Sequence, residues 1–421
     1  MKRWPSRPLA QCGRLLSGGT PSKSNPDFWG GSLPWFSSKE IRSFELSEAE
    51  LNVTELGAQN GTNLIPPGTV LFVVRGMSLA KEFRVGVTTV PATFNQDVKA
   101  IVPSADVDSR YLTRCLMWLE PMVLSQAEES SHGTKRLPSH IFEELPIPLP
   151  PLPEQRRIAD ILDKADAIRR KRKEAITLTE DLLRSAFLEM VGPRAPGYNE
   201  WPEYRLEQLA ASIPNAMRTG PFGSDLRHSE FVDSGIAVLG IDNAVKNRFT
   251  WGERRYITPQ KYESLKRYTV RPNDVIVTIM GTTGRSAVVP EDIPTAITSK
   301  HLATLSLNRD LVEPEFIAQA LHEHPGVVAQ IEQANRGAIM SGLNLGIIRA
   351  LTVRLPPLDV QRRFAMFTAK TRKLAQDNDC GLVVSDHLFS SLVDRAFRGE
   401  LTAPSASKKK QLDMFDALGG E

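Results

Sequence analysis

The sequence predicts an α+β protein with two α/β domains in a pseudo-twofold tandem repeat, separated by two long antiparallel coiled-coil helices. Three observations support this prediction. The second half of the 421-residue chain repeats the pattern of the first, both halves contain β-branched runs, and both end in a long helical pattern. An apolar content of 41 % is enough for several buried cores.

The repeat is clearest at a pair of proline-rich motifs. Residues 150–157 read PPLPEQRR and residues 356–363 read PPLDVQRR, an offset of 206. The same offset relates Ser185 of LLRSAF to Ser391 of LFSSLV. Repeats of this length indicate a duplicated folding unit.

Each copy divides into a variable part and a more closely matched helical part, which suggests one scaffold with two different surfaces. The predicted organisation is an α/β domain at 1–145, a central helical region at 146–197, a second α/β domain at 198–355, a C-terminal helical region at 356–402 and a disordered tail at 403–421.

Local patterns place elements within the variable parts. The β-branched runs LFVVRG (71–76) and VIVTIMG (275–281) predict strands. Residues 314–334 have helical apolar spacing, which Pro325 interrupts. Residues 17–36 and 218–224 are rich in Gly, Pro and Ser and are predicted to be loops.

A coiled-coil seam follows each proline motif. Apolar spacing of three and four predicts seam positions at Ile158, Ile161, Ala165, Ile168, Arg172, Ala175, Thr179, Leu182 and Ala186. The partner helix is predicted to use Phe364, Phe367, Thr371, Leu374, Leu388 and Leu392. Arg172 and Thr179 are flaws in the first stripe, and Asn378 and Gly381 are expected to weaken the second helix. Neither helix can bury its stripe alone, so the two are expected to pair.

Composition restricts the class of protein. The net charge is only +3, so any nucleic-acid surface must be local. Cys12, Cys115 and Cys380 have no metal-ligand spacing, and the sequence shows no signal peptide or membrane span. These features predict a cytoplasmic protein with free thiols.

Several segments together resemble a known family. They are IPLPPLPEQRRIADILDKAD, LLRSAFLEM, RLPPLDVQRRF, DRAFRGEL (394–401) and GGTPSKSNPDFWGGSLPWFSSKEI (18–41). This ordered set resembles the specificity (S) subunits of type I restriction-modification systems, the HsdS family, over residues 1–402.

The resemblance implies that each variable part is a target recognition domain that reads one half of a bipartite double-stranded DNA site. The helices would set the gap and dock two methyltransferase (M) subunits, which restriction (R) subunits would join. The resemblance assigns S-adenosylmethionine, ATP and Mg²⁺ to those partners and no cofactor to this chain, in a bacterial or archaeal cytoplasm at the nucleoid.

Motifs for catalysis are incomplete, so no catalytic residue and no metal ligand is predicted. NPDF (25–28) differs by one residue from the Asn-Pro-Pro-Phe pattern of amino-methyltransferases. GTTGRS (281–286) is too short for a phosphate loop, carries Arg285 in place of its lysine and favours a tight inter-strand turn. His322 and His324 lack metal-site spacing. A self-sufficient methyltransferase or nuclease and a plain scaffold with degenerate reading domains are the rival hypotheses.

Polar and basic loop residues are the candidate DNA contacts, because they can donate to base edges and phosphates. In the first domain they are Gly19, Thr20, Lys23, Arg75, Lys81, Arg84, Asn95, Gln96, Lys135 and Arg136. In the second they are Arg218, Thr219, Ser224, Asn243, Lys246, Arg285, Ser299, Lys300, Asn335, Arg336, Ser341 and Asn344.

Spacer and subunit-docking candidates lie at the two motif helices. They are Pro151, Leu152, Gln155, Arg156, Ile158, Ile161, Pro357, Leu358, Gln361, Arg362, Phe364 and Phe367. The basic run RRKRK (169–173) is either a solvated face or a phosphate or partner contact. In the tail, QLDMF (Gln411–Phe415) resembles the short peptide that binds the replication sliding clamp, and its use stays open.

Overall fold

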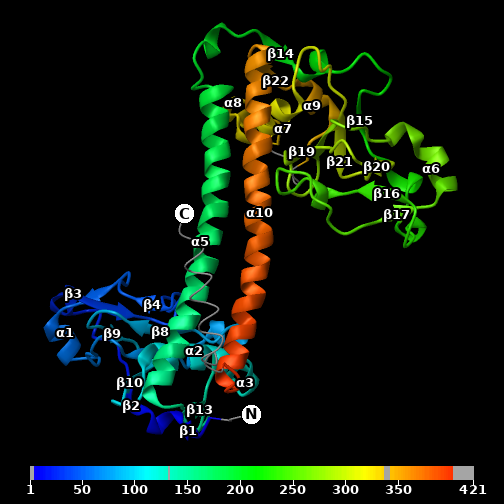
Figure 1. The fold of residues 1–421 in the computed structure, drawn as a ribbon. Helices are drawn as coiled ribbons and strands as arrows, with labels where there is room; N and C mark the ends of the chain where they lie inside the picture. The colour runs from blue at the N-terminus through cyan, green and yellow to red at the C-terminus, as the bar shows by residue number, and fades with distance from the viewer. Residues whose placement is uncertain (1–3, 131–132, 336–341, 402–421) are drawn as a thin grey trace, which may run out of the picture. The chain divides into compact units, whose positions relative to one another are not determined.

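A computed structural model describes residues 4–130, 133–335 and 342–401. The chain forms two compact units (Figure 1). The first unit contains Met1–Arg172 and Gly381–Glu421, and the second contains Lys173–Cys380. Within the described ranges, no helix combines the length and apolar character needed to cross a bilayer.

A five-stranded sheet forms the centre of the first unit. Its order is β2 (Gly13–Ser17), β10 (Val98–Pro103), β6 (Val70–Val73), β8 (Val85–Thr88) and β4 (Glu45–Leu46). The run predicted as a strand supplies the fully buried central strand β6, followed by the short β7 (Arg75–Gly76). That strand prediction is confirmed.

Three smaller sheets surround the central one. They are β5 (Asn52–Val53) with β3 (Trp29–Phe36) and β9 (Thr93–Phe94), β11 (Glu128–Glu129) with β12 (Lys135–Arg136) and β7, and β1 (Ser6–Pro8) with β13 (Pro146–Pro148). The loop prediction for 17–36 is therefore wrong at β3. Gly30 has a positive φ of 80°, and the β3–β5 register shifts between Trp29 and Leu33. The glycines there mark a β-bulge rather than a loop.

Helices complete the first unit's core: α1 (Glu55–Gln59), α2 (Ser109–Trp118), α3 (Glu120–Ser125) and α4 (Ser139–Glu143). The Asp108 carboxylate caps α2 by accepting a hydrogen bond from the Tyr111 amide over 3.0 Å. Tyr111 is fully buried in a core that also contains Ile158 and Phe397 of the two long helices. The helices are thus part of the unit's core.

The second unit repeats this architecture. Its sheets are β15 (Met217–Thr219), β21 (Leu302–Leu305), β18 (Val275–Thr278) and β19 (Ser286–Val288); β17 (Tyr256–Ile257), β16 (Ile236–Leu239) and β20 (Ala296–Thr298); and β14 (Glu203–Arg205) with β22 (Thr352–Arg354). Its helices are α6 (Pro259–Leu265), α7 (Pro314–Glu323), α8 (Pro325–Asn335) and α9 (Leu345–Ala350).

Three predictions for the second unit can be compared with these elements. The strand predicted in VIVTIMG is confirmed as β18, and Pro325 begins a new helix as expected. The loop prediction for 218–224 is wrong at its start, because Arg218 and Thr219 belong to β15. Pairing of β15 with β21 overrides the local turn signal of the following Gly-Pro.

The strand pairings show the duplication directly. The antiparallel pair β1–β13 opens and closes the first domain as β14–β22 does the second. The run β2-β10-β6-β8 matches β15-β21-β18-β19, and the parallel pair β3–β9 matches β16–β20. The predicted α+β fold with a tandem repeat is confirmed.

The two long helices are α5 (Leu152–Met190) and α10 (Leu358–Phe397). In the first unit, the start of α5 shares a core with the end of α10. In the second unit, Phe187 near the end of α5 packs against Phe364 near the start of α10, with ring centroids 5.7 Å apart. The helices run antiparallel within each unit, as predicted.

The seam itself differs from the prediction at alternate positions. Ile168 and Leu182 are about half exposed, at 50 % and 49 %, whereas Leu162 is fully buried. The better-buried positions on α5 are 158, 162, 165, 169, 172, 176, 179, 183 and 186. The corresponding positions on α10 are 364, 368, 371, 375, 378, 382, 385, 389 and 392, each 206 residues later. The spacing is four and three rather than three and four, so Leu374 and Leu388 also face outward.

Gly381 and Asn378 do not interrupt α10, which corrects the expectation of a weak centre. A Cβ at Gly381 would overlap the guanidinium of Arg172 on α5. The glycine therefore makes room for a large seam residue of the facing helix. This packing offsets its low helix propensity of about 1 kcal/mol.

Candidate nucleic-acid interface

In the first unit, two of the predicted loops meet at one edge of the domain. The Thr20 hydroxyl donates to Gln96 Oε1 over 2.8 Å, and the Gly19 amide donates to the Phe94 carbonyl over 2.9 Å. A Cβ at Gly18 would overlap backbone oxygens of Phe94 and Asn95, so glycine is required for this approach. Thr20, Gln96 and nearby Lys23 are exposed.

Three predicted cations gather on the neighbouring small sheet. Arg136 lies opposite Arg75, and Lys135 lies opposite Gly76, in the β12–β7 pair. Like charges directly opposite on a sheet repel each other, so this pair favours an anionic partner. Arg136 is compensated by Glu128 at 3.1 Å, and both arginines are exposed.

Arg84 and Lys81 are different from these cations. Arg84 is half-buried, pairs with Glu82 and donates to the Ser38 carbonyl over 3.3 Å, which gives it a role in loop packing. Lys81 is exposed.

The second unit repeats the close approach of loops. A Cβ at Gly220 would overlap the Ser299 carbonyl, as at Gly18 in the first unit. Gly220 therefore lies against Ser299, which is followed by the exposed Lys300. Ser299 Oγ is enclosed and has no hydrogen-bond partner among the described residues. The duplicated geometry therefore presents polar groups from two loops in each unit.

Three candidate contacts are internal in this structure. Arg218 donates to Asp274 over 2.7 Å and to the Thr269 carbonyl over 2.6 Å, and burial lowers its pKa although Asp274 opposes that shift. Asn95 Oδ1 accepts from the Asp97 amide, and Asn243 Oδ1 accepts from the Gly240 amide over 2.8 Å. The hydrogen-bonding atoms of these three side chains are used within the protein, so they are not available to contact DNA.

The remaining candidates have varied positions. Asn344 caps α9 by accepting from the Ile347 amide over 2.9 Å, and bridge pairing of Met280 with Gly342 brings this segment beside β18. Lys246 and Arg285 line a separate pocket. Ser224 and Asn335 have side chains that the structure does not describe, and Arg336 and Ser341 lie outside the described residues.

The motif glutamines form a joint between each domain and its helix. Gln155 Oε1 accepts from the Asp108 amide over 2.9 Å, and Gln155 Nε2 donates to the Pro150 carbonyl over 2.8 Å. Gln361 repeats this with the Glu313 amide at 2.9 Å and the Pro356 carbonyl at 2.7 Å. The repeated motif thus fixes where each helix leaves its domain.

The other docking candidates divide by burial. Ile158 and Phe364 are buried in the domain cores, Ile161, Phe367, Leu152 and Leu358 are intermediate, and Pro151, Arg156, Pro357 and Arg362 are exposed. The basic run 169–173 is not one continuous face, because Arg169 pairs with Asp386 at 2.6 Å and Arg170 lies 3.6 Å from Asp166.

Sequence reasoning missed a set of exposed apolar side chains on the long helices. On α5 they are Ile168, Leu178 and Leu182; on α10 they are Leu374, Val384 and Leu388. Each member of the second set follows one of the first by 206 residues, a signal that the sequence contained. The prediction assigned Ile168 and Leu182 to the buried seam, so this repeated exposed set was not recognised.

The residues considered for catalysis have structural roles. Asn25 of NPDF accepts a hydrogen bond from the Asp27 amide and caps a short 3₁₀ turn. Burial lowers the pKa of His322 to about 3, so its ring is neutral. Among the described residues, no group of three His, Cys, Asp or Glu side chains could hold a metal ion.

The chain thus combines a duplicated α/β domain with an antiparallel helix pair and with polar and basic loop clusters. Residues 1–178 match the family described as "Type I restriction modification DNA specificity domain". This match assigns the first domain and the first part of α5 to that family.

Individual relatives agree with this assignment. The chain is 33 % identical over 162 residues to the EcoR124I/EcoR124II specificity subunit of Escherichia coli, which covers 38 % of this chain and 40 % of that subunit. It is 22 % identical to the MjaIX specificity subunit of Methanocaldococcus jannaschii over 95 % of this chain and 94 % of that one. The type I S subunit of M. genitalium has the same fold, with a TM-score of 0.61 and 13 % identity over 94 % of this chain and 96 % of that one.

Proposed function

We propose that this chain is the non-catalytic DNA-specificity subunit of a type I restriction-modification complex. The domain at 1–145 reads one half of a bipartite site in double-stranded DNA, and the domain at 198–355 reads the other. The observation that carries this proposal is the duplicated loop approach, in which Gly18 lies against Asn95 in one unit and Gly220 lies against Ser299 in the other.

Base-edge contacts are assigned to the exposed polar groups of these loops, and phosphate contacts to the cations beside them. Thr20, Gln96 and Lys300 form the first group, together with the half-buried Thr219 at the end of β15. Arg75, Lys135 and Arg136 form the second. Arg75 and Arg136 lie directly opposite each other, so a bound phosphate would relieve their repulsion.

The helical regions 146–197 and 356–402 set the gap between the half-sites and dock two methyltransferase subunits. The exposed apolar side chains support this assignment. Ile168, Val384 and Leu388 belong to the first unit, and Leu374, Leu178 and Leu182 are their counterparts in the second. Two matching surfaces suit two copies of one partner.

The chemistry is assigned to the partner subunits. Adenine methylation with S-adenosylmethionine belongs to the methyltransferase subunits, and ATP- and Mg²⁺-dependent cleavage to the restriction subunits. The complex would work in the cytoplasm of a bacterium or archaeon, at the nucleoid.

Methylome sequencing of host DNA, with and without this chain, tests the proposal. A gapped, bipartite adenine motif that disappears on deletion is the expected result. Exchange of residues 1–145 for those of a relative should then alter one half of the motif only. An unchanged methylome would favour a plain scaffold, and changes in both halves would contradict modular reading.

The tail segment Gln411–Phe415, which lies outside the described residues, is a second proposed contact. Its QLDMF sequence supports binding to the apolar pocket of a replication sliding clamp. Titration of the tail peptide against purified clamp should give saturable binding, and a flat titration would remove this partner.

A further inference from the structure

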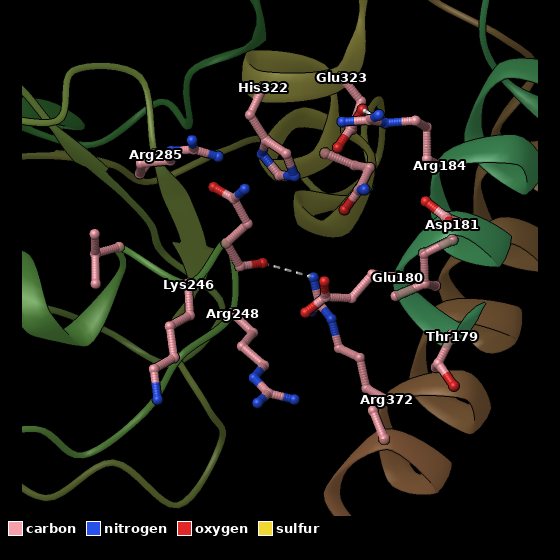
Figure 2. Close-up of a pocket in the computed structure, with 15 residues that line it drawn as sticks. Thr179, Glu180, Asp181, Arg184, Lys246, Arg248, Arg285, His322, Glu323 and Arg372 are labelled. Carbon is pink, nitrogen blue, oxygen red and sulfur yellow. Dashed lines mark hydrogen bonds and ion pairs between the residues drawn. The ribbon is translucent and has the colours of Figure 1, made fainter. Parts of the chain in front are cut away.

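A charged pocket of about 360 Å³ opens in the second unit, lined by α5, α7, α10 and the loop at 245–248 (Figure 2). Its cations are Arg184, Lys246, Arg248, Arg285 and Arg372. Its carboxylates are Glu180, Asp181 and Glu323. Since His322 is neutral, the lining has an excess of two positive charges.

Three of these five cations already have a partner. Arg184 pairs with Glu323 at 2.8 Å, and Arg248 pairs with Asp379 at 2.5 Å. Arg372 pairs with Glu315 at 2.7 Å. Lys246 and the Arg285 guanidinium make no ion pair with the described residues, and Figure 2 shows Arg285 extending toward the His322 ring. The pocket thus contains an uncompensated, planar donor of the kind that binds phosphate.

Arg285 belongs to the GTTGRS segment, which the proposed function does not use. Gly281 and Gly284 have φ values of 75° and 83°, as the tight turn between β18 and β19 requires. The Gly284 amide donates to the Thr278 carbonyl over 2.9 Å, and the Arg285 amide to Thr278 Oγ1 over 3.0 Å. These two amides are occupied, and Arg285 is the residue of this segment that lines the pocket.

The pocket wall also contains an unpartnered acceptor. Asn247 Oδ1 is enclosed and has no hydrogen-bond partner among the described residues. Asn247 is held in the left-handed region at a φ of 55°, and Arg372 donates to its carbonyl over 3.1 Å. A buried acceptor without a donor is unfavourable, so a ligand that carries a proton is favoured.

The matching position in the first unit is filled by protein. Asp108 precedes α2 and Glu313 precedes α7, and each donates its amide to the motif glutamine of its own unit. Helix α7 therefore corresponds to α2 at an offset of 205 residues. At this offset Arg114 of the first unit corresponds to Gln319 of the second. Arg114 is buried and pairs with Asp163 at 2.9 Å. The shorter Gln319 lines the open pocket instead.

We propose that this pocket binds inorganic phosphate. Arg285 donates to unprotonated oxygens, and Asn247 Oδ1 accepts from the protonated one. A phosphodiester and sulfate carry no proton at neutral pH and cannot supply that donor. No Phe, Tyr or Trp is among the described residues of the lining, so nothing there stacks a base.

Calorimetric titration of the full-length chain with inorganic phosphate, sulfate and adenosine monophosphate tests this inference. The result does not depend on whether the chain recognises DNA. We expect saturable phosphate binding, weaker sulfate binding, and a loss of about tenfold or more in Arg285→Gln, since a charged hydrogen bond contributes about 1.5–3 kcal/mol.

Arg205→Gln is the matched control, because Arg205 is an exposed arginine of the same unit that pairs with Glu207. Thermal unfolding of each variant establishes that it is folded. Adenosine monophosphate should bind more weakly than phosphate, because a monoester has mostly lost its proton at neutral pH. Equal affinity for the two would contradict the role of Asn247 as acceptor. Absence of saturable phosphate binding, equal affinity in Arg285→Gln and Arg205→Gln, or displacement of phosphate by a DNA duplex would overturn the inference.

Discussion

Gln155 accepts a hydrogen bond from the Asp108 backbone amide over 2.9 Å, and 206 residues later Gln361 does the same for Glu313. Both side chains are almost fully buried, at 1 % and 0 % exposure. The most closely repeated motif of the chain is therefore a structural joint. It sets the direction in which each long helix departs from its domain.

Replacement of either joint glutamine should destabilise its unit. Gln155→Ala leaves the Asp108 amide and the Pro150 carbonyl without a partner, and we expect a loss of about 2 kcal/mol in the free energy of unfolding. Urea unfolding followed by tryptophan fluorescence measures it. Arg156→Ala, at the exposed neighbour, should change stability by less than about 0.5 kcal/mol. Equal effects of the two variants would show that the joint is not important for stability.

The cross-strand arginines should contribute affinity without sequence preference. The double variant Arg75→Gln, Arg136→Gln should reduce the slope of log affinity for DNA against log salt by about 2, because each phosphate contact contributes about 0.9. Binding of the assembled complex across a salt series measures the slope. Arg194→Gln with Arg205→Gln removes two exposed charges elsewhere and should leave it unchanged. A changed target motif would instead place these arginines at base edges.

Acid should destabilise the second unit through His322. Burial, followed by repulsion from Arg372, lowers the pKa of His322 to about 3, below its unfolded value of about 6.5. The unfolded chain takes up the proton first, so stability falls as pH decreases from about 6.5 toward 3, by about 1.4 kcal/mol per pH unit from this group. Urea unfolding between pH 7 and 5 should show a shallower decline for His322→Asn. The exposed control, His140→Asn, should keep the wild-type slope.

Lengthening both long helices should widen the gap between half-sites. Seven residues inserted after Arg172 in α5 and after Cys380 in α10 preserve the heptad seam and add about 10 Å of helix, or about three base pairs of DNA. Methylome sequencing should report unchanged halves with a longer spacer. Insertions of three residues at the same places rotate the seam and should prevent assembly. An unchanged spacer in the heptad variant would contradict a measuring role.

The sequence predicted the fold because its strongest signals are repeated. Strands β6 and β18, the break at Pro325 and the antiparallel helices all followed from β-branched runs, a proline and matching motifs. The coiled-coil seam was harder to place, because apolar residues fit either of two heptad spacings, as Ile161 and Leu162 do. Only the packing of the two helices shows which of these neighbouring residues is buried.

Site prediction was limited by a different physical cause. Residue type indicates that Arg218 can donate hydrogen bonds, but not that Asp274 takes them in the interior. The glycines of residues 17–36 predict a loop, whereas Gly31 lies against the Val53 carbonyl within a strand pair. Gly381 is expected to weaken its helix, whereas it accommodates Arg172 of the facing helix. Contacts between segments far apart in sequence decide these cases, and no local pattern contains them.

The joint glutamines bond to main-chain atoms alone: the amides of Asp108 and Glu313, and the carbonyls of residues such as Pro150 and Pro356. Such a connection is indifferent to which side chains the attached domain carries. Recombination could therefore join a different α/β domain to either long helix, provided that the new domain supplies one backbone amide at the position of Asp108 or Glu313. The DNA target could then change while the two helices stay the same.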